Sequence, residues 1–254
     1  MSKITAIIPT FNEEENIREA LESVKFADEI MVVDSFSTDR TLDIVREYTS
    51  FIIQREYENS ASQKNWAIPQ ATHEWILLVD ADEKVTPELR DEIIETLKNQ
   101  DSQDVVAHWI YRTNFFMGKQ INYSGWQNDK VIRLFRKSKC RYQEKRVHAE
   151  IIADGKVGVM KNKLLHYTFK GMDETINKIN KYAEWKALDY DKKTGRLSPY
   201  HFVLKPMWAF VKHLIIKQGF RDGVPGFTIA KLQSYSIFIR YTKLWLFRQK
   251  KHIK

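Results

Sequence analysis

The sequence has few of the features that define several common protein classes. Its 254 residues include one cysteine, Cys140, which excludes an internal disulfide and fits a reducing compartment. No uninterrupted apolar stretch reaches the length of a transmembrane helix. The N-terminus runs directly into an apolar strand, so no secretory signal is expected. The nine glycines form neither a Gly-x-Gly-x-x-Gly dinucleotide loop nor a Gly-Lys-Ser/Thr phosphate loop. The sequence therefore favours a cytoplasmic protein that lacks both of these nucleotide-binding loops.

Apolar strands alternate with helical patterns in the N-terminal part of the chain. The run from Trp75 to Val79 is short and rich in Ile, Leu and Val, which is typical of a strand buried on both faces. Alternation of this kind implies right-handed crossovers and a mainly parallel α/β sheet. The expected strands are 4–10, 29–34, 51–53 and 75–80, and the expected helices are 12–24, 41–48, 61–71 and 87–98.

Two of these strands end in aspartate. Asp34 follows one strand, and Asp80 and Asp82 follow another, at the sheet edge where open α/β proteins bind ligands. Carboxylates with this spacing suit Mg²⁺ or Mn²⁺, which would hold a diphosphate. A helix cap or a solvated turn explains an isolated Asp-x-Asp equally well. Asp34 is either a strand-ending turn residue or an acceptor for a base N–H or a ribose hydroxyl.

Four motifs stand in order between residues 4 and 90: Ile8-Pro9-Thr10-Phe11-Asn12-Glu13-Glu14, Val32-Val33-Asp34-Ser35-Phe36-Ser37-Thr38-Asp39-Arg40-Thr41, Gln63-Lys64-Asn65 and Asp80-Ala81-Asp82. Together they resemble the motifs of family 2 glycosyltransferases. This resemblance implies the GT-A fold, a Rossmann-like, mainly parallel sheet flanked by helices.

Four later segments extend the likeness: Gly125-Trp126, Arg133-Leu134-Phe135-Arg136, Leu164-Leu165-His166-Tyr167 and Gly219-Phe220-Arg221-Asp222-Gly223. These segments are similar to the bacterial lipopolysaccharide core β-glucosyltransferase subgroup.

The resemblance implies an inverting, metal-dependent hexosyltransferase. Its donor would be a UDP-sugar, with glucose as the expected sugar, and its acceptor a lipid-linked glycan such as lipopolysaccharide core. Two alternatives stay open. The acceptor could be another glycan or a protein, or the chain could bind nucleotide-sugar with impaired catalysis.

The resemblance also implies roles for individual residues. Pro9, Thr10 and Glu13 would line the uridine site, Asp34 would contact the uracil edge, and Lys64 and Asn65 would lie near the nucleotide. Asp80 would contact ribose or metal, and Asp82 would coordinate Mg²⁺ or Mn²⁺ directly. His166, expected at the end of a strand spanning 157–165, matches a late histidine near the metal. The alternative for His166 is a half-buried histidine making one hydrogen bond.

The general base departs from the family pattern. An inverting transfer needs a base near the acceptor hydroxyl, and the subgroup usually has it as the glutamate of Val-His-Glu. This chain has Arg146-Val147-His148-Ala149-Glu150, with Ala149 where that glutamate is expected. Glu150 could serve only if the backbone shifts by one residue, which on a strand reverses the face of the side chain. Asp129 is the second candidate.

The C-terminal third differs in character and suggests a helical region over 171–254 after a catalytic domain over 1–170. Its apolar residues follow helical spacing between interleaved lysines and arginines, and the whole chain carries a net charge of +8. Such helices either pack an apolar face on the core or form an amphipathic appendage on an anionic membrane. We expect peripheral binding to the inner face of the cytoplasmic membrane. A nucleic-acid-binding module has the same composition, but no nucleic-acid motif is present. The spaced residues are Leu204, Met207, Trp208, Val211, Leu214, Ile215, Tyr235, Phe238, Tyr241 and Trp245.

Overall fold

The computed structural model describes residues 2–99, 104–145 and 149–252 and divides the chain into two compact units. The first unit comprises Met1–Thr113 and Asp129–Tyr167. The second comprises Asn114–Asn128 and Thr168–Lys254, so it contains an internal segment as well as the C-terminal third.

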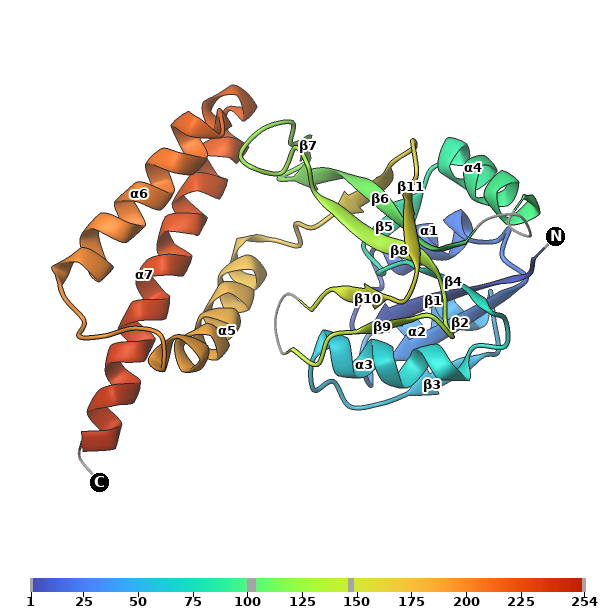
Figure 1. Cartoon of the computed structure of the whole chain (residues 1–254), viewed down its shortest axis with the longest axis horizontal. Coiled ribbons are helices and arrows are strands. Elements are labelled where there is room, and N and C mark those ends of the chain that lie inside the picture. The colour runs from blue at the N-terminus through green and yellow to red at the C-terminus, as the bar shows by residue number, and fades with distance from the viewer. Residues whose placement is uncertain (1, 100–103, 146–148, 253–254) are drawn as a thin grey trace. The chain divides into compact units, whose positions relative to one another are not determined.

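Four parallel strands form one half of the main sheet in the first unit, in the order β3-β2-β1-β4 (Figure 1). They are β1 (Ile4–Thr10), β2 (Glu29–Asp34), β3 (Ile52–Gln54) and β4 (Trp75–Leu78). The helices of this half are α1 (Ile17–Ser23), α2 (Thr41–Arg46), α3 (Ser60–Ala67) and α4 (Pro87–Lys98). The predicted α/β class is therefore confirmed. Helix α1 begins later than expected because residues 12–14 bond to the loop after β2.

The other half of the sheet is built largely from antiparallel pairs. β8 (Lys130–Arg136) lies antiparallel to both β4 and β6 (Val105–Phe116). β5 (Glu83–Val85) pairs antiparallel with β12 (Leu164–Tyr167), and β11 (Lys156–Val159) pairs parallel with β6. The remaining strands are β7 (Lys119–Gln120), on the end of β6 that belongs to the second unit, and a separate pair, β9 (Cys140–Tyr142) with β10 (Ile151–Ala153).

Side-chain alternation along β1 divides the core of the first unit into two layers. Ala6 and Ile8 are completely buried with apolar residues of α1, α2 and α4, whereas Ile7 is completely buried with those of α3, β9 and β10. The parallel strands are thus covered on both faces, as unbroken apolar runs require. Burying each such side chain contributes about 1.5–3 kcal/mol. Asp34 lies at the end of β2 and Asp80 just beyond β4, where the candidate site lies.

The expected strand over 157–165 is wrong. The structure has two short strands there, β11 and β12, separated by a turn. The Glu92 carboxylate of α4 accepts hydrogen bonds from the backbone N–H groups of Lys161 and Asn162, at 2.7 and 2.9 Å. These bonds replace ladder bonds, so the chain leaves β6 and continues as β12 beside β5.

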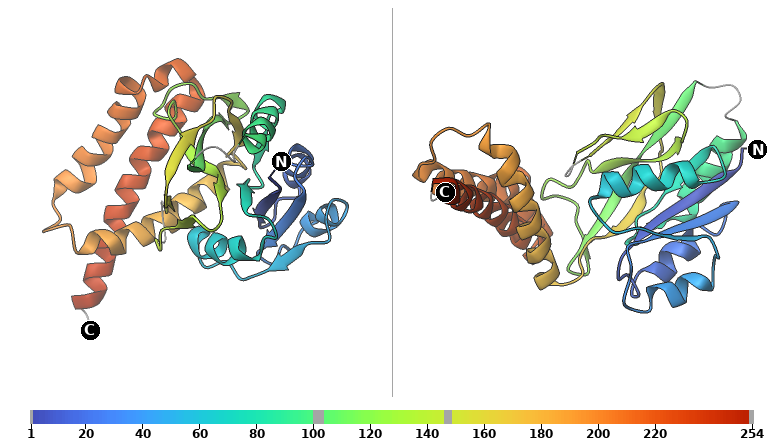
Figure 2. Two further views of the ribbon diagram at one scale, coloured as in Figure 1. Left: turned by 45° about the vertical axis from the view of Figure 1, so that its right-hand side comes forward. Right: turned by 90° about the horizontal axis from the view of Figure 1, so that it is seen from below.

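The second unit consists mainly of three helices, α5 (Met172–Asp191), α6 (Lys205–Val211) and α7 (Val224–His252), and α7 packs against the other two (Figure 2). π-helical turns at Tyr200–Leu204 and Lys212–Ile216 flank α6. The Asp222 carboxylate accepts from the backbone N–H groups of Asn122 and Tyr123, each at 3.0 Å, and so ties the internal segment to this unit. Among the helices of the described residues, none combines the length and apolarity needed to span a bilayer.

Candidate functional site

The loops after β1 and β2 are bonded to each other at the sheet edge. The Asn12 carboxamide oxygen accepts from Thr38 N at 2.8 Å, and Asn12 N donates to Ser37 Oγ at 2.9 Å. Asn12 and Phe36 have φ values of 51° and 62°, in the left-handed region that costs non-glycine residues energy. The two exposed side chains Phe11 and Phe36 extend from these loops. The cross-bonds hold two aromatic rings at the edge where a ligand is expected.

Asp34 is buried at the end of β2, and its carboxylate is hydrogen-bonded within the protein. It accepts from Ser37 Oγ at 2.6 Å, from Ser37 N at 3.1 Å and from Gln54 Nε2 at 2.8 Å. Thr10 is the partner of Asp34 across β1 and β2, and Gln63 Nε2 donates to Ser35 Oγ, next to Asp34 in the chain. Two buried atoms of these residues, Thr10 Oγ1 and Gln63 Oε1, have no hydrogen-bond partner among the described residues. Buried polar groups are normally paired, so these two atoms retain unused hydrogen-bonding capacity at the edge of the sheet.

The other residues expected near the nucleotide have structural contacts as well. Pro9 lies in β1 opposite Val33, half-buried. Glu13 N donates to Thr41 Oγ1 at 2.8 Å, and its carboxylate accepts from Asn16. The Asn65 carboxamide bonds to both the N–H and the C=O of Tyr142, at 2.8 and 3.0 Å, which holds β9 against α3. Asn65 thus shapes the pocket described below through Tyr142.

Asp80 lies between two buried cations. Lys64 Nζ is 2.9 Å from Asp80 Oδ1, and the Arg133 guanidinium bonds to Asp80 Oδ2. Burial by itself would raise the pKa of Asp80, but Arg133 and Lys64 hold it well below its usual range. Burial likewise opposes the charge of Lys64, and the Asp80 carboxylate outweighs that effect and raises the pKa of Lys64. All three groups are therefore charged at neutral pH.

The ion pairs continue beyond Arg133 into the protein. Glu83 Oε1 accepts from Arg133 Nη2 at 2.7 Å and from Arg112 Nη1 at 3.1 Å. Arg112 in turn forms a two-pronged pair with Asp129, at 3.0 and 2.9 Å. Burial opposes the charge of Arg112, but Glu83 and Asp129 raise its pKa. We call the six residues Lys64, Asp80, Arg133, Glu83, Arg112 and Asp129 the charge ladder. Its three cations and three carboxylates alternate along its length.

Asp82 and His166 form the second part of the carboxylate site. Asp82 Oδ2 is 3.6 Å from His166 Nε2, and the backbone oxygen of Asp82 accepts from Tyr167 N at 2.8 Å. The pairing of His166 with Glu83 across β12 and β5 brings these residues together. Carboxylate and imidazole are both ligands for Mn²⁺, so the pair fits part of a metal site. No group of three or more His, Cys, Asp or Glu suitable for a metal occurs among the described residues.

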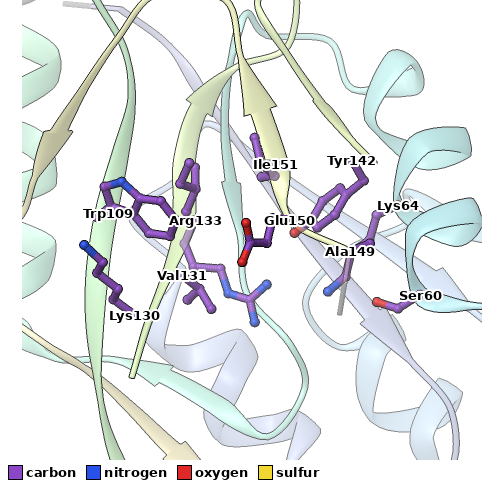
Figure 3. A pocket seen from close by; sticks show the side chains of 11 residues that line it. Ser60, Lys64, Trp109, Lys130, Val131, Arg133, Tyr142, Ala149, Glu150 and Ile151 are labelled. Carbon is purple, nitrogen blue, oxygen red and sulfur yellow. The ribbon is translucent and has the colours of Figure 1, made fainter. Parts of the chain in front are cut away.

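A pocket of about 410 Å³ opens beside Asp80, and Figure 3 shows the side chains that line it. Glu150 lines the pocket together with Ala149, and its carboxylate points toward Arg133. Within the described part of the chain, Glu150 makes no hydrogen bond or ion pair through that carboxylate. The preceding Arg146-Val147-His148 motif lies outside the described residues. The lining residues are Ser60, Lys64, Trp109, Lys130, Val131, Ile132, Arg133, Tyr142, Ala149, Glu150 and Ile151.

Sequence reasoning missed three residues of the charge ladder and both aromatic rings. Glu83 follows Asp82 directly, and a carboxylate beside an Asp-x-Asp motif was the available signal. Arg133 belongs to a segment already matched by resemblance, but nothing local indicates that it reaches Asp80. For Arg112 no signal exists, because its contacts depend on the pairing of β6 with β8.

The sequence of this chain matches a family model and the sequences of known proteins. The family model described as glycosyl transferase family 2 matches residues 5–154. A lipopolysaccharide core biosynthesis glycosyltransferase, LpsC of Rhizobium meliloti, is 31% identical over 95% of this chain and 92% of its own length. An uncharacterized glycosyltransferase of Rickettsia prowazekii is 30% identical over 96% of this chain and 87% of its own length.

The fold agrees with these matches. Mannosyltransferase PcManGT from Pyrobaculum calidifontis, solved with GDP-Man and Mn²⁺, superposes with a TM-score of 0.53 over 96% of this chain and 87% of that protein, at 18% identity. This likeness supports the predicted GT-A arrangement of sheet and helices. The family model matches more than half of the chain, and the two relatives are similar over most of both proteins' lengths. The chain therefore belongs to glycosyltransferase family 2.

Proposed function

We propose that the chain is an inverting, metal-dependent hexosyltransferase that moves a sugar from a UDP-sugar to a lipid-linked glycan such as lipopolysaccharide core, with glucose as the expected sugar. One observation carries the proposal: Lys64 and Arg133, the two cations paired with Asp80, line a pocket that also contains the carboxylate of Glu150. The similarity to LpsC supports a lipopolysaccharide core acceptor. An acceptor of another kind, a different glycan or a protein, is the alternative.

Asp82 and His166 would hold the divalent cation in this proposal, with Asp80 next to it. When bound, a cation neutralises the charge that develops on a departing nucleoside diphosphate. The Asp80 carboxylate is already paired with the side-chain cations Lys64 and Arg133. These two positive charges are therefore in place beside Asp80 before the donor binds. Lys64 lines the pocket and supplies further positive charge to the leaving diphosphate.

Glu150 is the general base that the geometry favours. Its carboxylate has no partner among the described residues and lies in the pocket, whereas Asp129 is committed to a two-pronged pair with Arg112. A carboxylate held by a guanidinium is a weaker base, because protonation would cost that pair. On a strand, Glu150 and Ala149 would point to opposite faces. β10 begins only at Ile151, so both residues precede the strand, and both line the pocket.

A second candidate function follows from Ala149. This residue lines the pocket where the family's glutamate is expected, and an alanine has no group that takes a proton. If Glu150 does not replace that glutamate, the chain binds UDP-sugar and transfers poorly. A screen of UDP-sugars tests both functions, with released UDP measured with and without Mg²⁺ or Mn²⁺ and lipopolysaccharide core. Metal-dependent binding without acceptor-stimulated UDP release would favour the second function.

Asp34 is expected to make the site prefer uracil over cytosine. A carboxylate accepts from uracil N3–H, whereas cytosine N3 carries no proton. The uracil would take the position of the Gln54 amide, which now donates to Asp34 Oδ2. Competition of UDP and CDP against a UDP-sugar measures this preference, and Asp34→Asn should reduce it by about tenfold, the scale of one charge-assisted hydrogen bond. If CDP competes as well as UDP, Asp34 does not read the base.

We further propose that the second unit binds the anionic inner face of the cytoplasmic membrane. Large apolar side chains around α6 are exposed, and Lys212, Lys217 and Arg221 lie among them, also exposed. Apolar surface beside basic residues suits an interface of acyl chains and anionic headgroups. We call the exposed apolar residues the α6 apolar face: Val203, Leu204, Met207, Trp208, Val211, Ile215, Ile216, Phe220 and Val224.

A charge on the α6 apolar face should weaken membrane binding. Trp208 is 58% exposed, so Trp208→Glu should leave the fold intact and reduce retention on anionic liposomes by about tenfold or more, the scale of losing one inserted aromatic side chain. Val159 in β11 is 55% exposed, and Val159→Glu is the matched control, expected to leave retention unchanged. Sedimentation with liposomes of stated composition measures both variants. Equal retention of Trp208→Glu and wild type would contradict membrane binding through α6.

A further inference from the structure

The charge ladder is partly exposed at its two aspartates and buried between them. The side chains of Asp80 and Asp129 are each 30% exposed, whereas Glu83 and Arg133 are 0% and 4% exposed. Arg112 is 16% exposed. Arg133 reaches the pocket, but Glu83 and Arg112 are not among the residues that line it, so any effect of Glu83 or Arg112 on the reaction passes through the residues they hold.

Glu83 connects the middle of the ladder to Asp80 in two ways. Its Oε1 accepts from both Arg133 and Arg112, and its Oε2 accepts from the backbone N–H of Asp80 at 3.0 Å. Glu83 N also donates to Asp80 O at 2.9 Å, which closes the turn that carries Asp82. Both the side chain and the backbone of Asp80 are thus positioned by Glu83 and Arg133.

Arg112 forms its ion pairs with Glu83 and Asp129 and acts on Asp80 only through its charge, which helps to lower the pKa of Asp80, but it limits where Glu83 lies. It is held between Glu83 and the two-pronged pair with Asp129. Removing charge from a buried series leaves the adjacent partner uncompensated, and that partner must move or be hydrated. A change at Asp129 is therefore expected to displace Arg112 and Glu83, and with them Asp80.

We propose that Asp129, Arg112 and Glu83 are positioning residues for donor binding, acting on Asp80 through Arg133, and that Asp129 is the outer anchor of the ladder rather than a general base. This inference rests on the proposed function, since it takes a UDP-sugar as the donor held beside Asp80. The two roles of Asp129 separate cleanly. A base affects the transfer step and leaves donor affinity unchanged, whereas an anchor affects donor affinity.

Calorimetric titration of UDP-glucose with Mn²⁺ tests the inference. Asp129→Asn and Arg112→Lys should each raise the dissociation constant for UDP-glucose about fivefold or more, within the range of coupling energies measured between linked residues. The double variant should be no weaker than the weaker single variant, because both changes break the same connection. In a Glu83→Gln background, Arg112→Lys should have no further effect. Arg136→Lys, on the same strand as Arg133 but outside the ladder, is the matched control and should bind like wild type.

A purely structural role for the ladder gives a different result. Urea unfolding would then show lower stability, and the titrations would show fewer binding-competent molecules with an unchanged dissociation constant. If wild type binds UDP-glucose, either of two results would overturn the inference. One is the structural outcome just described, and the other is independent, additive effects of Asp129→Asn and Arg112→Lys in the double variant. A wild-type chain that binds no UDP-sugar would instead overturn the proposed function, and the positioning role with it.

Discussion

Asp82→Ala is expected to abolish metal-dependent binding of UDP-sugar while leaving the protein folded. The side chain lies near His166 at the end of the sheet, and its truncation removes a carboxylate ligand without opening a cavity in either core layer. The backbone bond from Tyr167 N to Asp82 O is unaffected by the substitution. Losing a direct ligand should weaken donor binding in Mn²⁺ by at least about a hundredfold. Calorimetry with and without the metal measures this change.

Two comparisons sharpen the result for Asp82. His166→Ala should have a smaller effect in the same direction, since it leaves the carboxylates in place. Thermal unfolding of Asp82→Ala without metal should match that of wild type, which separates loss of a ligand from loss of fold. Unchanged metal-dependent affinity of Asp82→Ala would show that Asp82 does not coordinate the cation.

Glu150→Gln is expected to reduce sugar transfer by about a hundredfold or more, the usual scale for removing a general base. The substitution keeps the shape of the side chain, and Glu150 is exposed at the pocket, so the fold should not change. Affinity for UDP-sugar should remain that of wild type, because the base faces the acceptor. Steady-state transfer to lipopolysaccharide core, with donor affinity from calorimetry, separates the two quantities.

Substitutions at the neighbouring candidates complete the test of Glu150. At saturating donor, Asp129→Asn should reduce transfer far less than Glu150→Gln does. If wild type transfers poorly and Ala149→Glu raises turnover, the family's usual base position is the functional one. A fully active chain indifferent to Glu150→Gln, but inactivated by Asp129→Asn, would assign the base to Asp129.

The parallel half of the fold follows from local sequence patterns. Runs such as Ile4–Thr10 and Trp75–Leu78 are short and mostly apolar, and their length and their content of Ile and Leu favour a strand covered on both faces. Asp34 ends the similar run from Glu29, and Asp80 and Asp82 come just after the run from Trp75. Their position at one edge of the sheet was predictable because parallel strands all end on the same side of the sheet.

Contacts between distant segments could not be predicted in this way. The pairs joining Arg133 to Asp80 and Glu83 span 53 and 50 positions, and the pair joining Arg112 to Glu83 spans 29. They exist because β8 lies between β4 and β6, an order that no local pattern encodes. The break between β11 and β12 has the same origin, since Glu92 of α4 draws Lys161 and Asn162 away from the sheet.

The sequence by itself therefore determined the four parallel strands, the edge at which they end and the family. Periodicity and motif order are properties of neighbouring residues, so they can be read along the chain. Only the tertiary structure decided which carboxylates are free and which are paired: Glu150 lies open in a pocket, whereas Asp129 and Asp80 are held by arginines. It also decided that the apolar side chains of the α6 apolar face are exposed. Pairing and exposure depend on which surfaces the sheet order and helix packing bring together, and that information is not local.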